Sequence, residues 1–165
     1  MYPMKKYLIC SDIHGREENL RYVVMQESPL DGVIIAGDLQ METHEVEDVI
    51  RKENHKFELY MVCGNCDIYT HTASQLPPVL AFPISETHRV FLTHGHLFHG
   101  PSYSLLAVTA REKHCDIVVY GHTHCAVDET EEGIRFINGG ALRRGGYAIL
   151  TIGDDESVDV KLKLV

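Results

Sequence analysis

The sequence predicts an α/β fold, and the order of its hydrophobic patterns carries that prediction. The first part of the chain alternates short apolar runs, typical of strands, with segments whose apolar residues recur at helical spacing. The second part is mostly short strand-like runs around one helix. The 165 residues, 44% of them hydrophobic, are enough for a buried core. We therefore expect a single domain over residues 1–165.

The first five elements are expected as strand, helix, strand, helix and strand. The strands are predicted at 6–11, 31–36 and 57–62. The first helix is predicted over 15–27, and the second carries Val46, Val49 and Ile50 on one face, with Thr43 as its N-cap. This alternation indicates parallel strands with right-handed crossovers, whose ligands gather at the carboxyl ends of the strands.

The rest of the chain is expected to be rich in strands. A surface loop containing Pro77 and Pro78 is predicted over 68–78, and the one helix over 103–114. Turn residues at 131–133 and 153–156 suit hairpins. The predicted strands are 79–82, 89–93, 117–120, 125–129, 134–137, 146–152 and 158–164.

Composition limits the function classes. A net charge of −9 argues against a long nucleic acid as partner, because such proteins usually present a basic face. The chain has no apolar run of the about 18 residues that a membrane span needs, and its first residues lack a signal-peptide pattern. We expect a cytoplasmic protein without a membrane partner.

The five cysteines are odd in number, which argues against a disulfide scaffold. Cys63 and Cys66 form a C-x-x-C pair, which leaves a structural zinc site or a redox motif as alternatives. Both are disfavoured, because a zinc site usually needs a second pair and a thioredoxin-like motif opens a helix.

Polar side chains follow five of the predicted strands or apolar runs. In isolation, Asp12 and His14 read better as a surface aspartate and a capping histidine before Gly15, and Asp38 reads equally well as a turn or helix-capping residue. In extended chain, however, side chains two residues apart point the same way, so Asp12 and His14 can hold one ion. The five segments are Ser-Asp-Ile-His-Gly (11–15), Gly-Asp (37–38), Gly-Asn-Cys-Asp (64–67), Thr-His-Gly-His (93–96) and Gly-His-Thr-His (121–124).

Two histidine clusters make a metal site the better interpretation. His94 and His96 follow one apolar run, and His122 and His124 follow another, where Gly121 permits close approach of the backbone. Buried imidazoles without partners would be costly. Mixed nitrogen and carboxylate ligands suit Mn²⁺, Fe²⁺ or Zn²⁺ better than Ca²⁺ or Mg²⁺.

Together, over residues 7–141, these segments resemble the calcineurin-like metallophosphoesterases, in particular their small single-domain phosphodiesterase branch in bacteria and archaea. The resemblance implies a sandwich of two mixed β-sheets packed face to face, with helices on the outer faces. It also implies two divalent ions, Mn²⁺ in first place with Fe²⁺, Zn²⁺ or Ni²⁺ as alternatives. One ion would be held by Asp12, His14, Asp38 and His124, and the other by Asp38, Asn65, His94 and His122.

In that pattern Asp38 bridges two ions about 3.5 to 4 Å apart, and the water they share has a pKa near 7. The resulting hydroxide would attack phosphorus in line with the leaving oxygen. Asn65 would bind an ion through its amide oxygen and leave its NH₂ for the substrate. The predicted catalytic residues are Asn65, Cys66 and His96, and the predicted substrate contacts are Asn65, His96 and His99. His96 and His99 are also compatible with a structural or solvent-exposed position.

The chain departs from the family twice. Cys66 stands where many members of the wider superfamily carry a histidine that assists the leaving group, and a thiol is a poor substitute. Residues 138–141 read Asn-Gly-Gly-Ala where the small branch commonly has Asn-Pro-Gly-Ser. Arg143 and Arg144 follow, and read either as contacts to an anionic substrate or as a solvated loop.

The expected function is hydrolysis of a small phosphoester, with a phosphodiester favoured. A non-catalytic scaffold of the same fold, like the retromer subunit, is the main alternative, and a redox protein using Cys63 and Cys66 is the third. Every ligand position carries a competent residue, which favours the enzyme. A homo-oligomer is compatible with the sequence.

Overall fold

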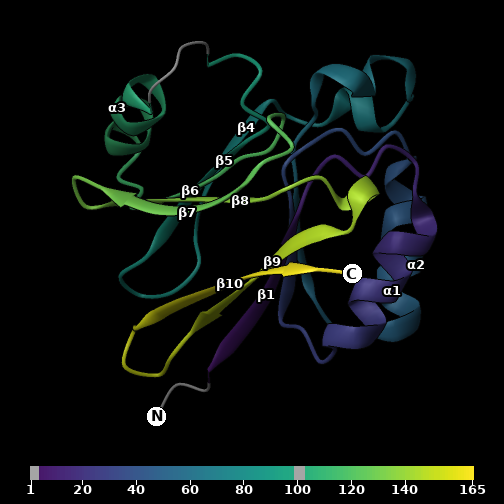
Figure 1. The fold of residues 1–165 in the computed structure, drawn as a ribbon, viewed down its shortest axis with the longest axis horizontal. Coiled ribbons are helices and arrows are strands. Elements are labelled where there is room, and N and C mark those ends of the chain that lie inside the picture. Colours follow the sequence, from purple (N-terminus) through teal and green to yellow (C-terminus); the bar gives the residue numbers. More distant parts are fainter. Residues whose placement is uncertain (1–3, 99–102) are drawn as a thin grey trace.

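Two five-stranded β-sheets lie face to face, with helices on their outer sides (Figure 1). This computed structural model describes residues 4–98 and 103–165. Helices α1 (Glu17–Glu27) and α2 (Thr43–Glu53) cover one sheet, and α3 (Ser104–Glu112) covers the other. The predicted sandwich of two mixed sheets is confirmed.

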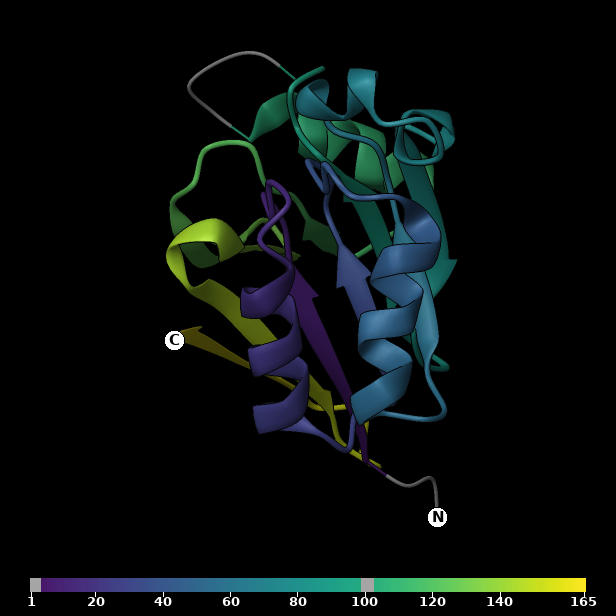
Figure 2. The same cartoon turned by 90° about the vertical axis from the view of Figure 1, so that its right-hand side faces the viewer.

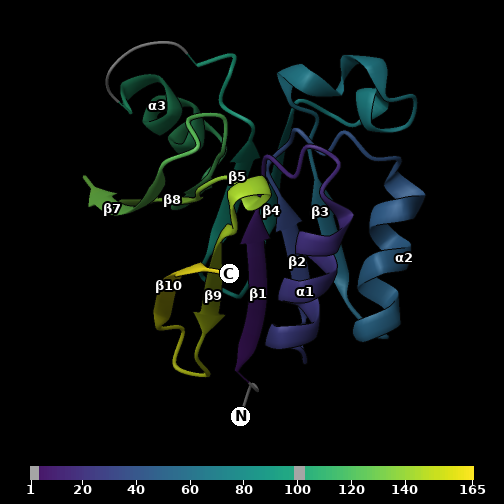
Figure 3. The same ribbon diagram turned by 45° about the vertical axis from the view of Figure 1, so that its right-hand side comes forward.

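The first sheet contains the three strands that open the chain. Strands β1, β2 and β3 are parallel, whereas β9 and β10 are antiparallel to their neighbours. Their carboxyl ends therefore lie at one edge of the sheet (Figure 3). In spatial order the strands are β10 (Val158–Leu164), β9 (Gly146–Ile152), β1 (Lys5–Cys10), β2 (Gly32–Ile35) and β3 (Glu58–Met61).

The second sheet repeats this principle. Strands β5, β6 and β8 are parallel, and β4 and β7 complete the edges in antiparallel orientation. Parallel strands direct their ends toward one side, so β5 and β6 bring a second set of loops to the seam between the sheets. The order is β4 (Val79–Pro83), β5 (Arg89–Thr93), β6 (Ile117–Val119), β8 (Ile134–Gly139) and β7 (Ala126–Glu131).

Strand periodicity explains how one strand serves two cores. Successive side chains point to opposite faces of a sheet. In β1, Leu8 packs in the cluster beneath α1 and α2, together with Leu20, whereas Ile9 packs in the cluster between the sheets, together with Val119. Figure 2 shows α1 and α2 side by side across the outer face of the first sheet. The result is two rigid sheets whose strand ends are fixed relative to one another.

Local differences from the sequence prediction are small. The loop predicted at 68–78 contains part of one short 3₁₀ helix, η1 (Asn65–Tyr69), and all of another, η2 (Ala73–Gln75). Thr43 is the first residue of α2 rather than its N-cap, which is Glu42. The backbone N–H of Glu42 is satisfied instead by the Glu45 carboxylate at 3.0 Å. A third 3₁₀ helix, η3 (Leu142–Arg144), follows β8.

In the described residues, no helix is both long and apolar enough to cross a membrane. All five cysteines are free thiols.

Candidate metal centre

The loops that follow β1, β2, β5 and β6 meet at the seam between the two sheets. Backbone hydrogen bonds join them in pairs, from the N–H of Asp12 to the carbonyl of Gly37 at 3.0 Å and from the N–H of Gly121 to the carbonyl of His94 at 3.0 Å. The N–H of His14 also donates to the carbonyl of Asp38 at 3.1 Å. The loop backbones therefore hold the side chains of the predicted ligands in fixed positions.

Five predicted ligands adopt left-handed backbone conformations. Their φ angles are 54° for Asp12, 47° for His14, 55° for Asp38, 68° for His122 and 60° for His124. The expectation that Asp12 and His14 converge because the chain is extended is therefore wrong. Residues other than glycine rarely adopt positive φ, at a cost of about 1 to 3 kcal/mol each, and such residues cluster at functional sites.

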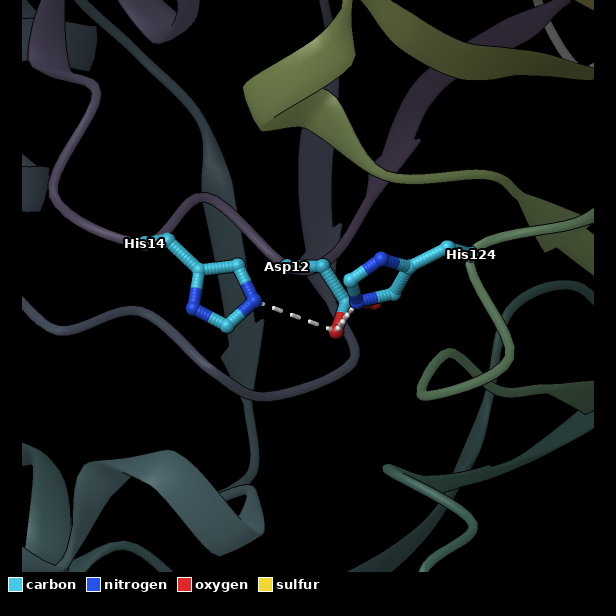
Figure 4. Close-up of side chains that lie close together, drawn as sticks. All are labelled: Asp12, His14 and His124. Carbon is cyan, nitrogen blue, oxygen red and sulfur yellow. Dashed lines mark ion pairs between the residues drawn. The ribbon is translucent and has the colours of Figure 1, made fainter.

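Asp12 links the two sheets through one oxygen and leaves the other free. Its Oδ2 accepts hydrogen bonds from Ser11 Oγ at 2.6 Å and from the backbone N–H of His122 at 3.1 Å. Its Oδ1 lies 3.2 Å from His124 Nε2 and 3.7 Å from His14 Nε2 (Figure 4). The carboxylate is fully buried, so its free oxygen is aimed into the site.

The two carboxylate oxygens of Asp38 also have different roles, one in a backbone hydrogen bond and one facing histidines. Its Oδ1 accepts the backbone N–H of Cys66 at 2.8 Å. Its Oδ2 lies 3.2 Å from His94 Nε2 and 3.7 Å from His14 Nε2. Burial raises the pKa of Asp38, but the neighbouring His94 imidazole and the Cys66 N–H outweigh it and hold that pKa well below its usual value.

Two histidines are oriented with Nε2 toward the carboxylates. His94 Nδ1 lies 2.7 Å from the carbonyl oxygen of Ala36, and His14 Nδ1 lies 2.5 Å from Gln40 Oε1. Both oxygens are acceptors, so Nδ1 carries a hydrogen in each ring and Nε2 is the atom that faces the carboxylates. Among the described residues, His14 Nε2, His94 Nε2 and Asp12 Oδ1 are buried without a hydrogen bond. Buried polar atoms without partners are costly, and cations bound among these side chains would satisfy all three.

The same atoms form groups that fit a metal ion. Within each group the ligand atoms lie within 4.8 Å of one another. Without an ion, burial lowers the pKa of His94, but Asp38 and the Ala36 carbonyl raise it above its usual value overall. A proton and a metal cation therefore compete for His94 Nε2. The groups are Asp12 with His14 and His124, Asp12 with Asp38 and His94, and His14 with Asp38 and Cys66.

Asn65 and His122 lie beside these groups and pair with each other. Asn65 Oδ1 is 3.1 Å from His122 Nδ1, and the rings of His122 and His94 are 5.1 Å apart. The Asn65 NH₂, predicted to be available to substrate, donates instead to Cys66 Sγ at 3.5 Å. Among the described His, Cys, Asp and Glu residues, His122 belongs to no group of three close ligand atoms.

Of the remaining predicted site residues, His96 and Cys66 lie close to the ligand groups. The His96 ring lies 5.5 Å from that of His94 and 6.3 Å from that of His122, which puts it at the centre. The Cys66 thiol lies within 4.8 Å of ligand atoms of His14 and Asp38, and burial followed by the charge of Asp38 raises its pKa. His99 lies outside the described residues.

Two buried residues that the sequence interpretation left without a role hold the ligand loops. Asp67 Oδ2 accepts the backbone N–H groups of Asp38 at 2.9 Å and Gly64 at 2.8 Å. Asn138 Nδ2 donates to the carbonyl of Gly121 at 3.2 Å and to Thr123 Oγ1 at 3.1 Å. The sequence feature that could have identified Asp67 and Asn138 is their position in the Gly-Asn-Cys-Asp and Asn-Gly-Gly-Ala segments.

Glycine is required where two loops touch the carboxylates. A Cβ atom on Gly64 would lie 2.2 Å from Asp38 Oδ1, and one on Gly121 would lie 2.5 Å from Ser11 Oγ. Real Cβ contacts of this length do not occur, so a side chain at either position would displace a ligand loop. The close approach predicted for Gly121 is confirmed.

Comparisons with known proteins agree with this geometry. Residues 5–155 match the family model of the calcineurin-like phosphoesterase superfamily domain. The chain is 34% identical over 158 residues to the probable metallophosphoesterase YsnB of Bacillus subtilis strain 168, with 90% of this chain and 85% of YsnB covered. It is 32% identical over 160 residues to the phosphodiesterase YfcE of Escherichia coli K12, with 84% and 80% covered.

Solved structures show the same fold. A predicted phosphoesterase from Streptococcus pneumoniae TIGR4 superposes with a TM-score of 0.79 at 24% identity, covering 99% of this chain and 91% of that one. Vacuolar Protein Sorting 29 of Cryptosporidium parvum gives a TM-score of 0.73 at 17% identity, with 99% of both chains covered. At these identities the likeness concerns the fold. Family model, relatives and ligand groups together establish that the chain belongs to the calcineurin-like phosphoesterase superfamily and is a metal-dependent phosphoesterase.

Proposed function

We propose that the chain hydrolyses a small phosphodiester with two divalent metal ions. The observation that carries this proposal is the set of three buried atoms without hydrogen bonds, Asp12 Oδ1, His14 Nε2 and His94 Nε2, which converge from loops of both sheets. In the proposed arrangement one ion is held by Asp12, His14, Asp38 and His124. The other is held by Asp38, Asn65, His94 and His122.

The chemistry that two such ions supply is a shared water made acidic enough, with a pKa near 7, to attack phosphorus in line with the leaving oxygen. The protein contributes orientation. Asp38 joins the two ligand sets, with Oδ1 fixed by the Cys66 N–H and Oδ2 directed at His94 and His14. His96 lies beside His94 and His122, where it is placed to contact a phosphoryl oxygen.

A diester is the preferred substrate class for two reasons. The relative YfcE is named a phosphodiesterase. In addition, Cys66 occupies the position beside Asn65 where an imidazole would assist a poor leaving group, so esters with good leaving groups are favoured. Mn²⁺ is proposed as the working ion because nitrogen and carboxylate ligands are mixed, with Fe²⁺, Zn²⁺ and Ni²⁺ as alternatives.

The test combines metal content with hydrolysis. Purified protein should carry about two ions per chain when loaded with Mn²⁺, and should hydrolyse bis(p-nitrophenyl) phosphate faster than p-nitrophenyl phosphate. Chelation should abolish hydrolysis and Mn²⁺ should restore it. Full-rate hydrolysis by metal-free protein would overturn the proposal, whereas metal binding without hydrolysis would favour the scaffold alternative. Activity that ignores chelators but needs both Cys63 and Cys66 would favour a redox protein.

The bridging role of Asp38 has its own test. Asp38→Asn should weaken binding of both ions, whereas His14→Ala or His124→Ala should weaken one. Calorimetric Mn²⁺ titration should therefore lose two binding events in the first variant and one in each of the others. If Asp38→Asn retained both ions at wild-type affinity, Asp38 would not be the bridge.

A further inference from the structure

A hollow of about 460 Å³ opens directly beside the metal centre. It lies where the ends of β7 and β8 meet β9, β10 and η3, and His124 forms part of its wall. In Figure 4 the ribbon of η3 passes close to His124. A cavity of this volume is in the range that accepts small organic ligands.

Small residues keep the hollow open. Gly139, Gly140 and Gly146 contribute bare backbone to its wall, and Ala126 and Ala141 add only methyl groups. Gly140 has a φ of 82°, a conformation that residues with a side chain rarely adopt. Its N–H is held by Asn138 Oδ1 at 2.9 Å. The opening is therefore built into the Asn-Gly-Gly-Ala segment.

The hollow contains one cation without a partner. In the described part of the chain, the exposed Arg144 guanidinium has no hydrogen bond or ion pair. Lys163, the other cation of the wall, donates to Glu27 Oε2 at 2.7 Å and is already neutralised. In a chain with net charge −9, an unpaired arginine next to a metal centre is suited to an anion.

The backbone fixes Arg144 relative to the ligands. The N–H of Leu142 donates to the carbonyl of Ser11 at 2.9 Å, and the N–H of Arg143 to that of Asp12 at 3.1 Å. The turn then closes at Gly145, with a φ of 93°. Arg144 thus stands on a turn that is bonded directly to the loop carrying Asp12.

We propose that this hollow binds the organic group of the phosphoester and that Arg144 binds a second anionic group on it, a phosphate or a carboxylate. The apolar wall, which includes Leu162 and Leu164, would contact the uncharged part of that group. The inference rests on the proposed function and deepens it. It makes the substrate a diester with a second negative charge on its organic group, rather than a diester of uncharged aryl or alkyl groups.

The experiment compares three chromogenic diesters with Mn²⁺-loaded protein. They are bis(p-nitrophenyl) phosphate, the p-nitrophenyl ester of thymidine 5′-phosphate, and the same nucleotide ester carrying a 3′-phosphate. Wild type should prefer the 3′-phosphorylated ester over its unphosphorylated counterpart by about tenfold to a hundredfold in kcat/KM, the range of a hydrogen bond to a charged group. Most of the difference should lie in KM, because Arg144 does not touch the reacting atoms.

Arg144→Ala should remove that preference, and Arg144→Lys should restore part of it. Arg143→Ala is the matched control, since Arg143 is its exposed neighbour on the same turn but does not line the hollow. A readout independent of turnover is the thermal shift produced by thymidine 3′,5′-bisphosphate compared with thymidine, which should shrink only in Arg144→Ala.

The outcomes separate the two proposals. Absence of bis(p-nitrophenyl) phosphate hydrolysis in wild type would count against the proposed function itself. If wild type hydrolyses that ester but shows no preference for the 3′-phosphate, or if Arg143→Ala and Arg144→Ala behave alike, the hollow is not an anion-binding subsite.

Discussion

The Asp67 carboxylate positions Asp38 by binding the backbone of Asp38 rather than the Asp38 side chain. Its Oδ2 accepts the N–H of Asp38 at 2.9 Å, and its Oδ1 accepts the N–H of Gln40 at 2.9 Å. Asp67 is fully buried. One carboxylate therefore fixes the residues on both sides of Leu39, and with them the orientation of the proposed bridging ligand.

Asp67→Asn should cost both stability and metal affinity. Three N–H groups, including that of Gly64, now share two oxygens, and an amide keeps only one. At least one buried donor would lose its acceptor, which destabilises by about 1 to 3 kcal/mol. Supporting residues of this kind typically change metal affinity by about 10- to 100-fold.

Urea unfolding of the metal-free protein and a Mn²⁺ titration measure the two effects. Asp48→Asn is the control, because Asp48 is exposed on α2 and forms a surface ion pair with Arg51 at 3.7 Å. It should change stability by less than about 1 kcal/mol. Wild-type metal affinity in Asp67→Asn would show that the position of Asp38 does not depend on Asp67.

Asp12→Asn should separate folding from metal binding. Without an ion, Asp12 is a buried charge whose Oδ1 lacks a hydrogen bond among the described residues. An amide at Oδ1 would donate to His124 Nε2, now 3.2 Å away, while the remaining oxygen keeps Ser11 and the His122 N–H. The metal-free variant should gain stability by about 1 kcal/mol, since sites kept for function are often strained.

The gain should reverse when Mn²⁺ is added. Binding to the folded state stabilises wild type by about 2.7 kcal/mol when the ion is at 100 times its Kd, and the variant should lose most of this. Thermal unfolding with chelator and with Mn²⁺ gives both values. A variant less stable than wild type under chelation would mean that the free oxygen is not a cost to the metal-free fold.

Glu27 should make the fold sensitive to acid. Its carboxylate, 6% exposed, receives hydrogen bonds from Tyr147 at 2.8 Å and Lys163 at 2.7 Å. Burial raises the pKa of Glu27, but these hydrogen bonds and the charge of Lys163 outweigh it, so the net pKa is lowered. Because the folded pKa lies below the unfolded value of about 4.3, the contribution is complete above pH 4.3 and is lost as the pH falls through the folded pKa.

Glu27→Gln should destabilise by about 1 to 3 kcal/mol at pH 7 and flatten the fall in stability below pH 4.3. Denaturant unfolding of chelated protein from pH 3 to 7 tests this, with Glu53→Gln, at the exposed end of α2, as the control. Equal pH slopes in wild type and Glu27→Gln would remove Glu27 from the acid response.

The strands were predictable because one strand must serve two cores. Leu8 and Ile9 are both apolar since one faces the helices and the other faces the second sheet, and such runs stand out from polar loops. The turn at Glu132 and Gly133, with φ of 49° and 84°, is the two-residue hairpin connection expected there. Local periodicity and turn residues were therefore enough for the elements, whereas the arrangement in two mixed sheets was predicted from the family resemblance.

The site was predictable in its ligand types but not in how they are held. The left-handed conformations of Asp12 and His124 are imposed by loops that meet across the seam, and no local pattern encodes them. Asp67 and Asn138 act through backbone groups distant in sequence. The hollow beside His124 is formed by three separate segments of the chain, so it emerges only from the packing of the sheets.

Cys66 gives the sharpest chemical prediction. Its thiol lies with His14 and Asp38 in one group of close ligand atoms and receives the Asn65 NH₂ at 3.5 Å. Imidazole is the common proton donor to a leaving group, worth about 10²- to 10⁴-fold, and this position carries none. The rate of the wild-type enzyme should therefore depend steeply on the pKa of the leaving group, with nitrophenyl esters far ahead of alkyl esters.

Cys66→His should flatten that dependence and improve alkyl and monoester hydrolysis, provided that metal content is unchanged. The decisive measurement is kcat/KM across a series of leaving groups for both proteins at matched metal occupancy. Parallel slopes would mean that Cys66 has no bearing on the leaving group, and would direct attention to His96 as the proton donor.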